Sequence, residues 1–159
     1  MWDEIAAEVA TEFPDVTWDK MLTDAMTTRM VGKPASLDTI VATNLHADIL
    51  SDLAAALAGS LGIAPTCNLD PERRFPSMFE PIHGSAFDIA GKGIANPIGA
   101  IWTGALMLEH LGEKHAADLL MEAVEHVTAR GPRTPDLCGT AKTCEVAAAI
   151  CDAMHSGSV

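Results

Sequence analysis

Apolar residues recur at helical spacing in six segments of the chain, and β-branched residues gather in two short runs. The helical spacing predicts helices over residues 2–11, 24–31, 44–57, 97–111, 113–130 and 140–154. The short runs, Val16–Thr23 and Leu37–Thr43, predict strands. Between Gly59 and Pro97 lie ten glycines and prolines, a density that favours strands and ordered loops over long helices. These patterns together indicate the α/β class.

The predicted helices near the C-terminus carry continuous apolar stripes. In the helix that precedes Gly112 the stripe consists of Ile98, Ile101, Trp102, Ala105 and Leu108. In the last helix we expect Cys144, Ala147, Ala148 and Cys151 to be buried. The cysteines at 67, 138, 144 and 151 form no C-x-x-C pair, so reduced thiols are favoured over a metal site.

Composition and charge narrow the possible functions. The chain has 159 residues, is 48% hydrophobic and has a net charge of −12. An acidic balance without basic clusters argues against binding nucleic acid or an anionic membrane. No apolar stretch reaches the 18 or more residues of a membrane span, and the acidic N-terminal segment lacks the basic start of a secretory signal. We therefore expect a cytoplasmic protein.

Two aspartates share one face of a predicted helix. Asp48 and Asp52 lie four residues apart, so their side chains project about 40° from each other around the helix axis. Paired carboxylates repel unless a cation lies between them, and hard oxygen ligands suit Mg²⁺ or Mn²⁺. From spacing alone, a stabilising acid in the first helical turn and a solvent-exposed acid after it are favoured over a metal site. Asp24, which opens the preceding helix, is open to the same two interpretations.

A glycine-rich segment runs from Glu80 to Asn96. Such a loop can bring backbone N–H groups to a phosphate and the Asp88 carboxylate to ribose hydroxyls. It is neither the dinucleotide fingerprint nor a P-loop, because Gly91–Asn96 lacks the third glycine and Lys92 is followed by Gly93. Read from the residues alone, the segment could also be an ordered turn that ends in a helix cap at Asn96.

These segments resemble the isocitrate and isopropylmalate dehydrogenase family of β-decarboxylating dehydrogenases. Asn44–Asp52, continued by Gly59–Gly62, is similar to the family signature, and Glu80–Ala86, Asp88 and Gly91–Pro97 resemble its nucleotide loop. Thr134–Leu137 resembles a further family segment. The pair His46–Ala47 and the residues from 68 to 78 are most similar to the tartrate and D-malate dehydrogenase branch.

The resemblance implies a fold, a set of cofactors and a set of site residues. The fold would be the two-domain isopropylmalate dehydrogenase type, which is not a Rossmann fold, with residues 1–58 in the smaller metal-binding and dimerisation domain and 59–159 in the larger nucleotide domain. Asp48 and Asp52 would bind Mg²⁺ or Mn²⁺ together with Asp24 across a dimer interface. Residues of the loop would bind NAD: Glu80, His83, Gly84, Ser85, Ala86, Asp88, Ile89 and Asn96. Asp88 would repel a 2′-phosphate, which favours NAD over NADP.

The chain also departs from the family. The family enzymes are about twice as long, and the resemblance covers only their C-terminal part. The substrate-binding arginines and the catalytic Lys and Tyr have no counterpart in the chain, which contains no Tyr, and Cys138 stands where the family usually has Gly. We expect oxidation of a small 2-hydroxy diacid by the family enzyme, no catalytic residue in this chain, and little turnover by it alone. A homodimer or a missing N-terminal half would be its partner, and a non-catalytic metal-binding or oligomerisation module is the alternative.

Overall fold

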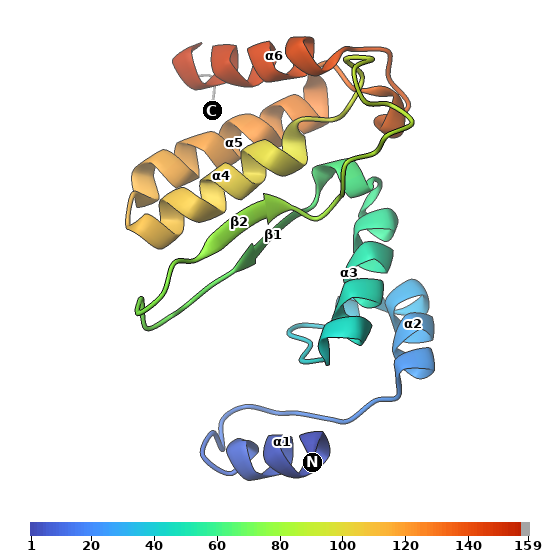
Figure 1. Cartoon of the computed structure of the whole chain (residues 1–159), viewed down its shortest axis with the longest axis vertical. Helices are drawn as coiled ribbons and strands as arrows, with labels where there is room; N and C mark the ends of the chain where they lie inside the picture. Colours follow the sequence, from blue (N-terminus) through green and yellow to red (C-terminus); the bar gives the residue numbers. More distant parts are fainter. Residues whose placement is uncertain (157–159) are drawn as a thin grey trace. The chain divides into compact units, whose positions relative to one another are not determined.

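The computed structural model describes residues 1–156 and divides the chain into two compact units, Met1–Leu50 and the part from Ser51 onward. The elements follow in the order α1 (Trp2–Ala10), α2 (Thr23–Gly32), η1 (Pro34–Ser36), α3 (Asn44–Ala58), η2 (Leu61–Ile63), β1 (Pro65–Asn68), β2 (Met78–Pro81), α4 (Ile98–Leu111), α5 (Lys114–Arg130), η3 (Pro135–Leu137) and α6 (Thr143–Ser156) (Figure 1). The six helices predicted from the apolar spacing are confirmed. The division falls within α3, whereas the sequence places the domain boundary after residue 58, and that assignment stays a prediction.

The first unit consists of α1, α2, the segments that follow them and the first part of α3, up to Leu50. Asp3 and Glu4 lie in the first turn of α1, where acids are favoured by the helix dipole. Arg29 ties the end of α2 to η1 because its Nε donates to Ser36 Oγ over 2.9 Å and its Nη2 donates to Ser36 O over 2.9 Å. α1 itself buries none of its residues, and Ile5 and Val9 stay 54% and 46% exposed.

The two predicted strands in this unit do not form. Residues 16–22 and 37–43 lie outside any helix or strand, and no ladder joins them to another segment among the described residues. A β-branched run adopts a strand only when a neighbouring strand satisfies its backbone groups. The prediction was therefore wrong for both runs, because each has β propensity but no pairing partner among residues 1–156.

The second unit is built on three helices and a hairpin. α5 packs against α4 on one side and α6 on the other, and the core between them is formed by Ile98, Ala123, Val124, Val127, Val146, Ile150 and Ala153 (Figure 1). β1 and β2 form an antiparallel pair, with Cys67 opposite Phe79, and the hairpin packs against α4. The strands and loops predicted between Gly59 and Pro97 are thus confirmed, as is the α/β class of the partial chain.

The buried face of α6 differs from the prediction. Val146, Ile150 and Ala153 face the core with 1%, 2% and 7% exposure, whereas Cys144, Ala148 and Cys151 are exposed and Ala147 is only half-buried. Both sets have helical spacing, but the larger apolar side chains of Val146 and Ile150 bury more surface against α5. The four cysteines are free thiols.

Several large apolar side chains stay exposed. Phe13, Phe75 and Phe87 are 54%, 71% and 89% exposed, and Trp2 is 53% exposed. None of the helices in residues 1–156 combines the length and apolar character that crossing a bilayer requires.

Candidate functional site

The predicted metal ligands Asp48 and Asp52 lie on α3, both exposed and four residues apart. Thr43 O accepts the first helical hydrogen bond, from Ala47 N over 2.8 Å, so Thr43 is the N-cap of this helix. The helix begins at Asn44 as predicted, and the two carboxylates share one face of it. Their oxygen atoms are the donors that Mg²⁺ and Mn²⁺ prefer, so this pair fits a divalent cation.

Asp24 lies in the first turn of α2, as predicted. Its Oδ1 accepts a hydrogen bond from Ala25 N over 2.8 Å, and its backbone O accepts from the hydroxyls of Thr27 and Thr28. Within residues 1–156 no three His, Cys, Asp or Glu side chains come together in a group that could hold a metal. The structure therefore does not bring Asp24 to the α3 pair within one chain, and its role across a dimer interface stays a prediction.

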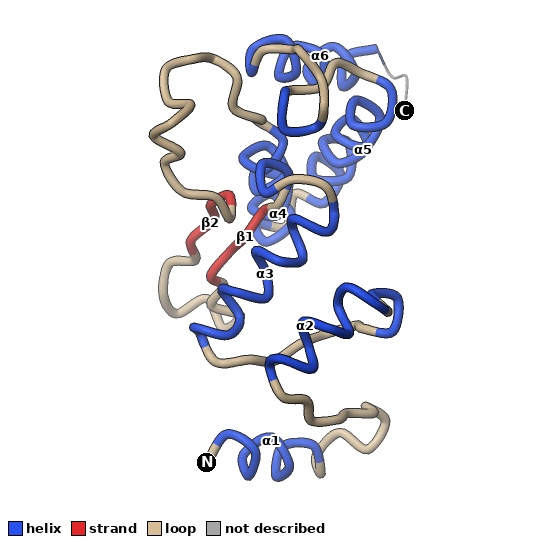
Figure 2. The backbone as a smooth tube through the Cα atoms, turned by 90° about the vertical axis from the view of Figure 1, so that its right-hand side faces the viewer, coloured by secondary structure: helices blue, strands red, loops and turns tan. Residues whose placement is uncertain are grey.

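The predicted nucleotide residues lie at the end of β2 and along the connection from β2 to α4. We call residues 82–97 the nucleotide loop, the long tan segment between β2 and α4 in Figure 2. Glu80 is exposed on β2, His83 is half-buried with its Nδ1 3.1 Å from Gly84 O, and Gly84–Asp88 is exposed. Ala86 has a φ of 42°, and its carbonyl accepts from Ile89 N over 2.9 Å and Ala90 N over 3.1 Å. This tight turn leaves the Ser85 and Asp88 side chains open to a ligand.

Asn96 has a different environment, because it is 7% exposed and both ends of its amide are used. Its Oδ1 accepts from Ile98 N over 3.0 Å, so the Asn96 side chain caps an N–H at the start of α4 as predicted, although Pro97 occupies the N-cap position itself. Its Nδ2 donates to Asp136 Oδ2 over 2.9 Å. The side chain of Asn96 therefore holds the end of the loop, and any contact of this residue with a cofactor would use its backbone or its remaining N–H.

Asp136, in η3, joins three segments that are distant in the sequence. Its Oδ2 also accepts from Ser60 Oγ over 2.5 Å, and Ser60 Oγ in turn accepts from Gly62 N over 2.9 Å. Gly62 has no room for a side chain, since a Cβ there would lie 2.8 Å from Asn96 Cβ and 3.0 Å from Asp136 Oδ2. The sequence does not identify Asp136 as a site residue. It only places Asp136 in the Thr134–Leu137 segment that resembles the family.

The carboxyl group of Asp136 is tuned by this environment. Burial favours its neutral form, but the hydrogen bonds from Ser60 and Asn96 and the nearby Thr134 hydroxyl outweigh burial, so the pKa of Asp136 is lowered. Thr134 lowers the pKa of Asp136 because its hydroxyl lies close to the carboxylate, although the buried Thr134 Oγ1 makes no hydrogen bond to the described residues.

We expect Asp136→Asn to lower the free energy of unfolding at neutral pH by about 1 kcal/mol, because the ionised carboxylate accepts stronger hydrogen bonds than an amide. A pKa that is lowered on folding stabilises the fold above the unfolded-state value near 3.8 and loses this contribution as the pH falls through the folded-state value. The difference between the two proteins should therefore be constant above about pH 5 and shrink toward pH 3. Urea denaturation across this range measures it, with Asp152→Asn as a control, and a difference independent of pH would contradict it.

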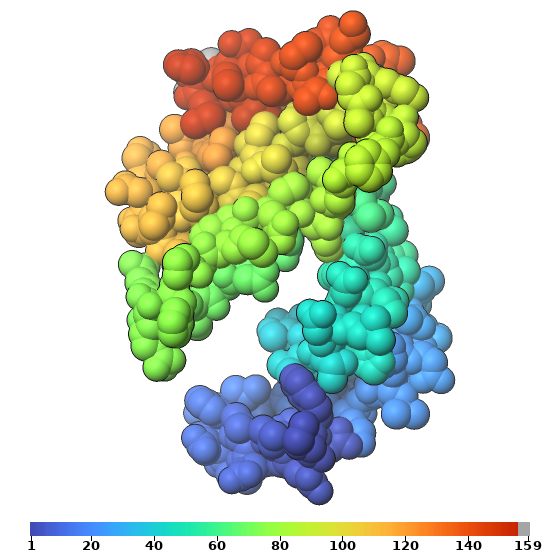
Figure 3. Space-filling model, in the orientation of Figure 1, coloured from blue at the N-terminus to red at the C-terminus, as the bar shows by residue number. Residues whose placement is uncertain are grey.

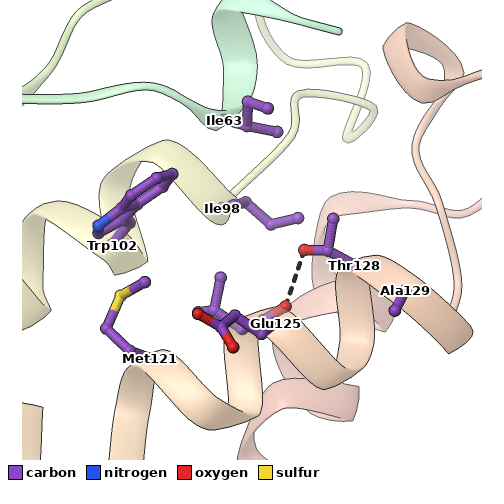
Figure 4. A pocket seen from close by; sticks show the side chains of 8 residues that line it. Ile63, Ile98, Trp102, Met121, Glu125, Thr128 and Ala129 are labelled. Carbon is purple, nitrogen blue, oxygen red and sulfur yellow. Dashed lines mark hydrogen bonds between the residues drawn. The ribbon is translucent and has the colours of Figure 1, made fainter. Parts of the chain in front are cut away.

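A pocket of about 320 Å³ lies between η2, α4 and α5 (Figure 4). Its walls are mostly apolar: Ile63, Ile98, Trp102, Met121, Val124, Glu125, Thr128 and Ala129. The Thr128 hydroxyl is already used, because it donates to Val124 O over 2.7 Å. With Glu125 as its one charged wall residue, the pocket offers no set of groups for acid–base or metal chemistry. It is separate from the predicted nucleotide residues.

The sequence matches known proteins over nearly its whole length. The isocitrate/isopropylmalate dehydrogenase family model matches residues 1–152. The whole chain is 74% identical to a probable tartrate dehydrogenase/decarboxylase of Agrobacterium vitis and covers 44% of that protein. A D-malate dehydrogenase (decarboxylating) of Escherichia coli K12 is 51% identical over 94% of the chain and 43% of the relative.

Among solved structures, isocitrate dehydrogenase from Methylococcus capsulatus matches 95% of the chain and 44% of its own length, with a TM-score of 0.89 and 44% identity. The chain thus spans less than half the length of these relatives. Because the family model covers nearly all of the sequence, the chain belongs to the isocitrate/isopropylmalate dehydrogenase family.

Proposed function

We propose that this chain supplies the metal-binding and nucleotide-binding elements of an NAD-dependent dehydrogenase that oxidises and decarboxylates a small 2-hydroxy diacid such as tartrate or D-malate. The observation that carries the proposal is the 74% identity over all 159 residues to a probable tartrate dehydrogenase/decarboxylase. The acidic pair on α3 and the exposed loop after β2 lie inside this match. They are the two segments that we propose bind the metal ion and the cofactor.

The metal proposal rests on the donor set. Asp48 and Asp52 present carboxylates from one face of α3, and Asp24 of a second subunit would complete the site. A bound divalent cation supplies Lewis-acid polarisation of the substrate oxygens, and NAD supplies a hydride acceptor. The role of this chain is to hold both in place. A homodimer is therefore part of the proposal, and a cytoplasmic location agrees with the four free thiols.

The cofactor proposal rests on the exposure of the first half of the nucleotide loop. Gly84–Asp88 is exposed, so the Ser85 hydroxyl and the Asp88 carboxylate can reach a ligand. A carboxylate accepts hydrogen bonds from the two ribose hydroxyls and repels a phosphate on the 2′ oxygen. NAD should therefore bind better than NADP, with its adenosine half held by Glu80, His83, the turn at Ala86, Ile89 and Asn96.

A chimera tests the function directly. In it, this chain replaces the matching segment of the Agrobacterium vitis relative, so that the rest of a complete enzyme is present. We expect NADH formation from tartrate or D-malate with Mn²⁺ and little with NADP, whereas the 159-residue chain alone should bind ligands without turnover. A folded chimera that forms no NADH would contradict the dehydrogenase proposal. Turnover by the isolated chain would contradict the expectation that it carries no catalytic residue.

A further inference from the structure

We propose that residues 133–143, here called the clamp segment, hold the second half of the nucleotide loop in its binding conformation, with Asp136 and Thr143 as positioning residues. The inference rests on the proposed function, because it takes the loop to be the nucleotide site. It assigns a role to the Thr134–Leu137 motif, which the metal and nucleotide sites do not use. Figure 3 shows the loop on the surface, in yellow-green, beside the orange-red beginning of α6.

Thr143 makes the first attachment with two groups of one residue. Its backbone N donates to Gly93 O over 3.0 Å, and its Oγ1 donates to Ala95 O over 2.5 Å. Thr143 begins α6, so its N–H is one of the helical donors that have no partner within the helix. The loop satisfies this donor, and the two carbonyls that accept are fixed against the first residue of α6, a helix that packs on the core through Val146, Ile150 and Ala153.

Asp136 makes the second attachment, at Asn96, the next-to-last residue of the loop before α4. It accepts from Asn96, and Asn96 accepts from Ile98, so the carboxylate, the amide and the start of α4 form one chain of hydrogen bonds. The bond from Ser60 extends this chain to the segment between α3 and β1. Gly93, Ala95 and Asn96 are thus held by partners that lie 40 to 50 residues away in the sequence.

The clamp segment is itself held in a closed shape. Thr134 O accepts from Leu137 N and Gly139 N, each over 3.0 Å, and Arg133 O accepts from Ala141 N over 2.9 Å. Thr134 is only 1% exposed. A segment with internal hydrogen bonds of this kind is rigid, so it can keep a bonded loop in one conformation.

Gly84–Asp88, in the first half of the loop, is bonded differently. It is exposed, and the backbone hydrogen bonds that the Ala86 carbonyl accepts come from the loop itself and not from the clamp segment. The free half carries the side chains proposed to contact ribose and phosphate, and the held half determines where that free half begins and ends. Fixing one half in advance lowers the conformational entropy that binding must remove.

The test uses the 159-residue chain, with ADP-ribose as the probe for the adenosine half of the cofactor. Thr143→Val removes the hydroxyl but keeps the shape and the backbone N–H, Thr143→Ser restores the hydroxyl, and Thr140→Val is the matched control in the same segment. We expect Thr143→Val to speed amide hydrogen exchange at residue 143 and at Ile98, whose N–H groups donate to Gly93 O and Asn96 Oδ1. It should also weaken ADP-ribose binding about fivefold, since a preorganised loop loses part of its advantage. Exchange in α5 should not change, and Thr143→Ser should return both readouts to near the original values.

The outcomes separate the two proposals. If the original chain does not bind ADP-ribose, the loop is not the nucleotide site and the proposed function loses its cofactor element, while exchange at residue 143 and Ile98 still tests the clamp. If Thr143→Val leaves both exchange and affinity unchanged, the clamp proposal is overturned. It is equally overturned if exchange rises throughout α5 as much as at residue 143 and Ile98, because Thr143 would then act on global stability alone. Asp136→Asn should repeat the local pattern, with Asp152→Asn as its control.

Discussion

Asp52→Asn is expected to lower kcat/KM of the chimera at fixed Mn²⁺ by at least about 100-fold, which corresponds to about 2.7 kcal/mol of lost transition-state stabilisation. A metal ligand contributes several kcal/mol when it positions a Lewis acid at developing negative charge. The amide of Asn keeps the size of the side chain and one oxygen, so the change tests charge and not shape. Initial rates with NAD and tartrate over a range of Mn²⁺ concentrations measure the effect.

The same substitution should have the opposite effect on stability. Without metal, Asp48 and Asp52 are like charges four residues apart on α3, and such a pair destabilises a helix by a few tenths of a kcal/mol. Asp52→Asn removes this repulsion, so the metal-free chain should be as stable as the original or slightly more stable. Asp152→Asn, an exposed aspartate on α6, should leave the Mn²⁺ dependence unchanged.

This pairing of effects distinguishes a metal site from an ordinary exposed face. If Asp48 and Asp52 were only solvated acids, Asp52→Asn would give the same small change in stability with no loss of activity. If they were structural, both activity and stability would fall. Loss of Mn²⁺-dependent activity without loss of stability is the result expected of a ligand pair.

Local sequence patterns predicted the helices correctly, because the backbone hydrogen bonds of a helix join residues only four positions apart. The spacing of Asp48 and Asp52 and the cap at Asn96 were predictable for the same reason. The runs Val16–Thr23 and Leu37–Thr43 could not be judged locally, since a strand depends on a partner that the sequence does not identify. On α6, Cys144 and Val146 belong to two stripes with equal spacing, and only packing against α5 decides which one is buried.

The attachments of the nucleotide loop were outside the reach of the sequence for a related reason. Asp136 contacts Asn96 and Ser60 across 40 and 76 residues, and Thr143 contacts Ala95 across 48. No periodicity or short motif reports such pairs. The resemblance marked Thr134–Leu137 as a family segment without giving it a physical role, which appears only when the fold brings the segment to the loop.

Gly139→Ala is expected to lower the free energy of unfolding by about 3 kcal/mol, because a side chain there forces the backbone of the clamp segment apart. A Cβ at this position would lie 1.9 Å from Arg133 O, and a backbone carbonyl cannot rotate away as a flexible side chain can. Relief of the clash must break the hydrogen bond of Gly139 N to Thr134 O or that of Ala141 N to Arg133 O. Urea denaturation followed by tryptophan fluorescence, which changes as the half-buried Trp102 becomes exposed, measures the loss.

The control for this prediction is the same substitution on α4. A Cβ at Gly104 would meet nothing within 4 Å, and the residue lies inside a helix, where alanine is favoured over glycine. Gly104→Ala should therefore raise the free energy of unfolding by about 0.5–1 kcal/mol. The two variants add the same methyl group to the same chain, so opposite signs can come only from the surroundings. If Gly139→Ala lowers the free energy of unfolding by less than about 1 kcal/mol, the clamp segment can change its conformation to fit a side chain. A segment that adjusts so easily cannot hold the nucleotide loop in one conformation.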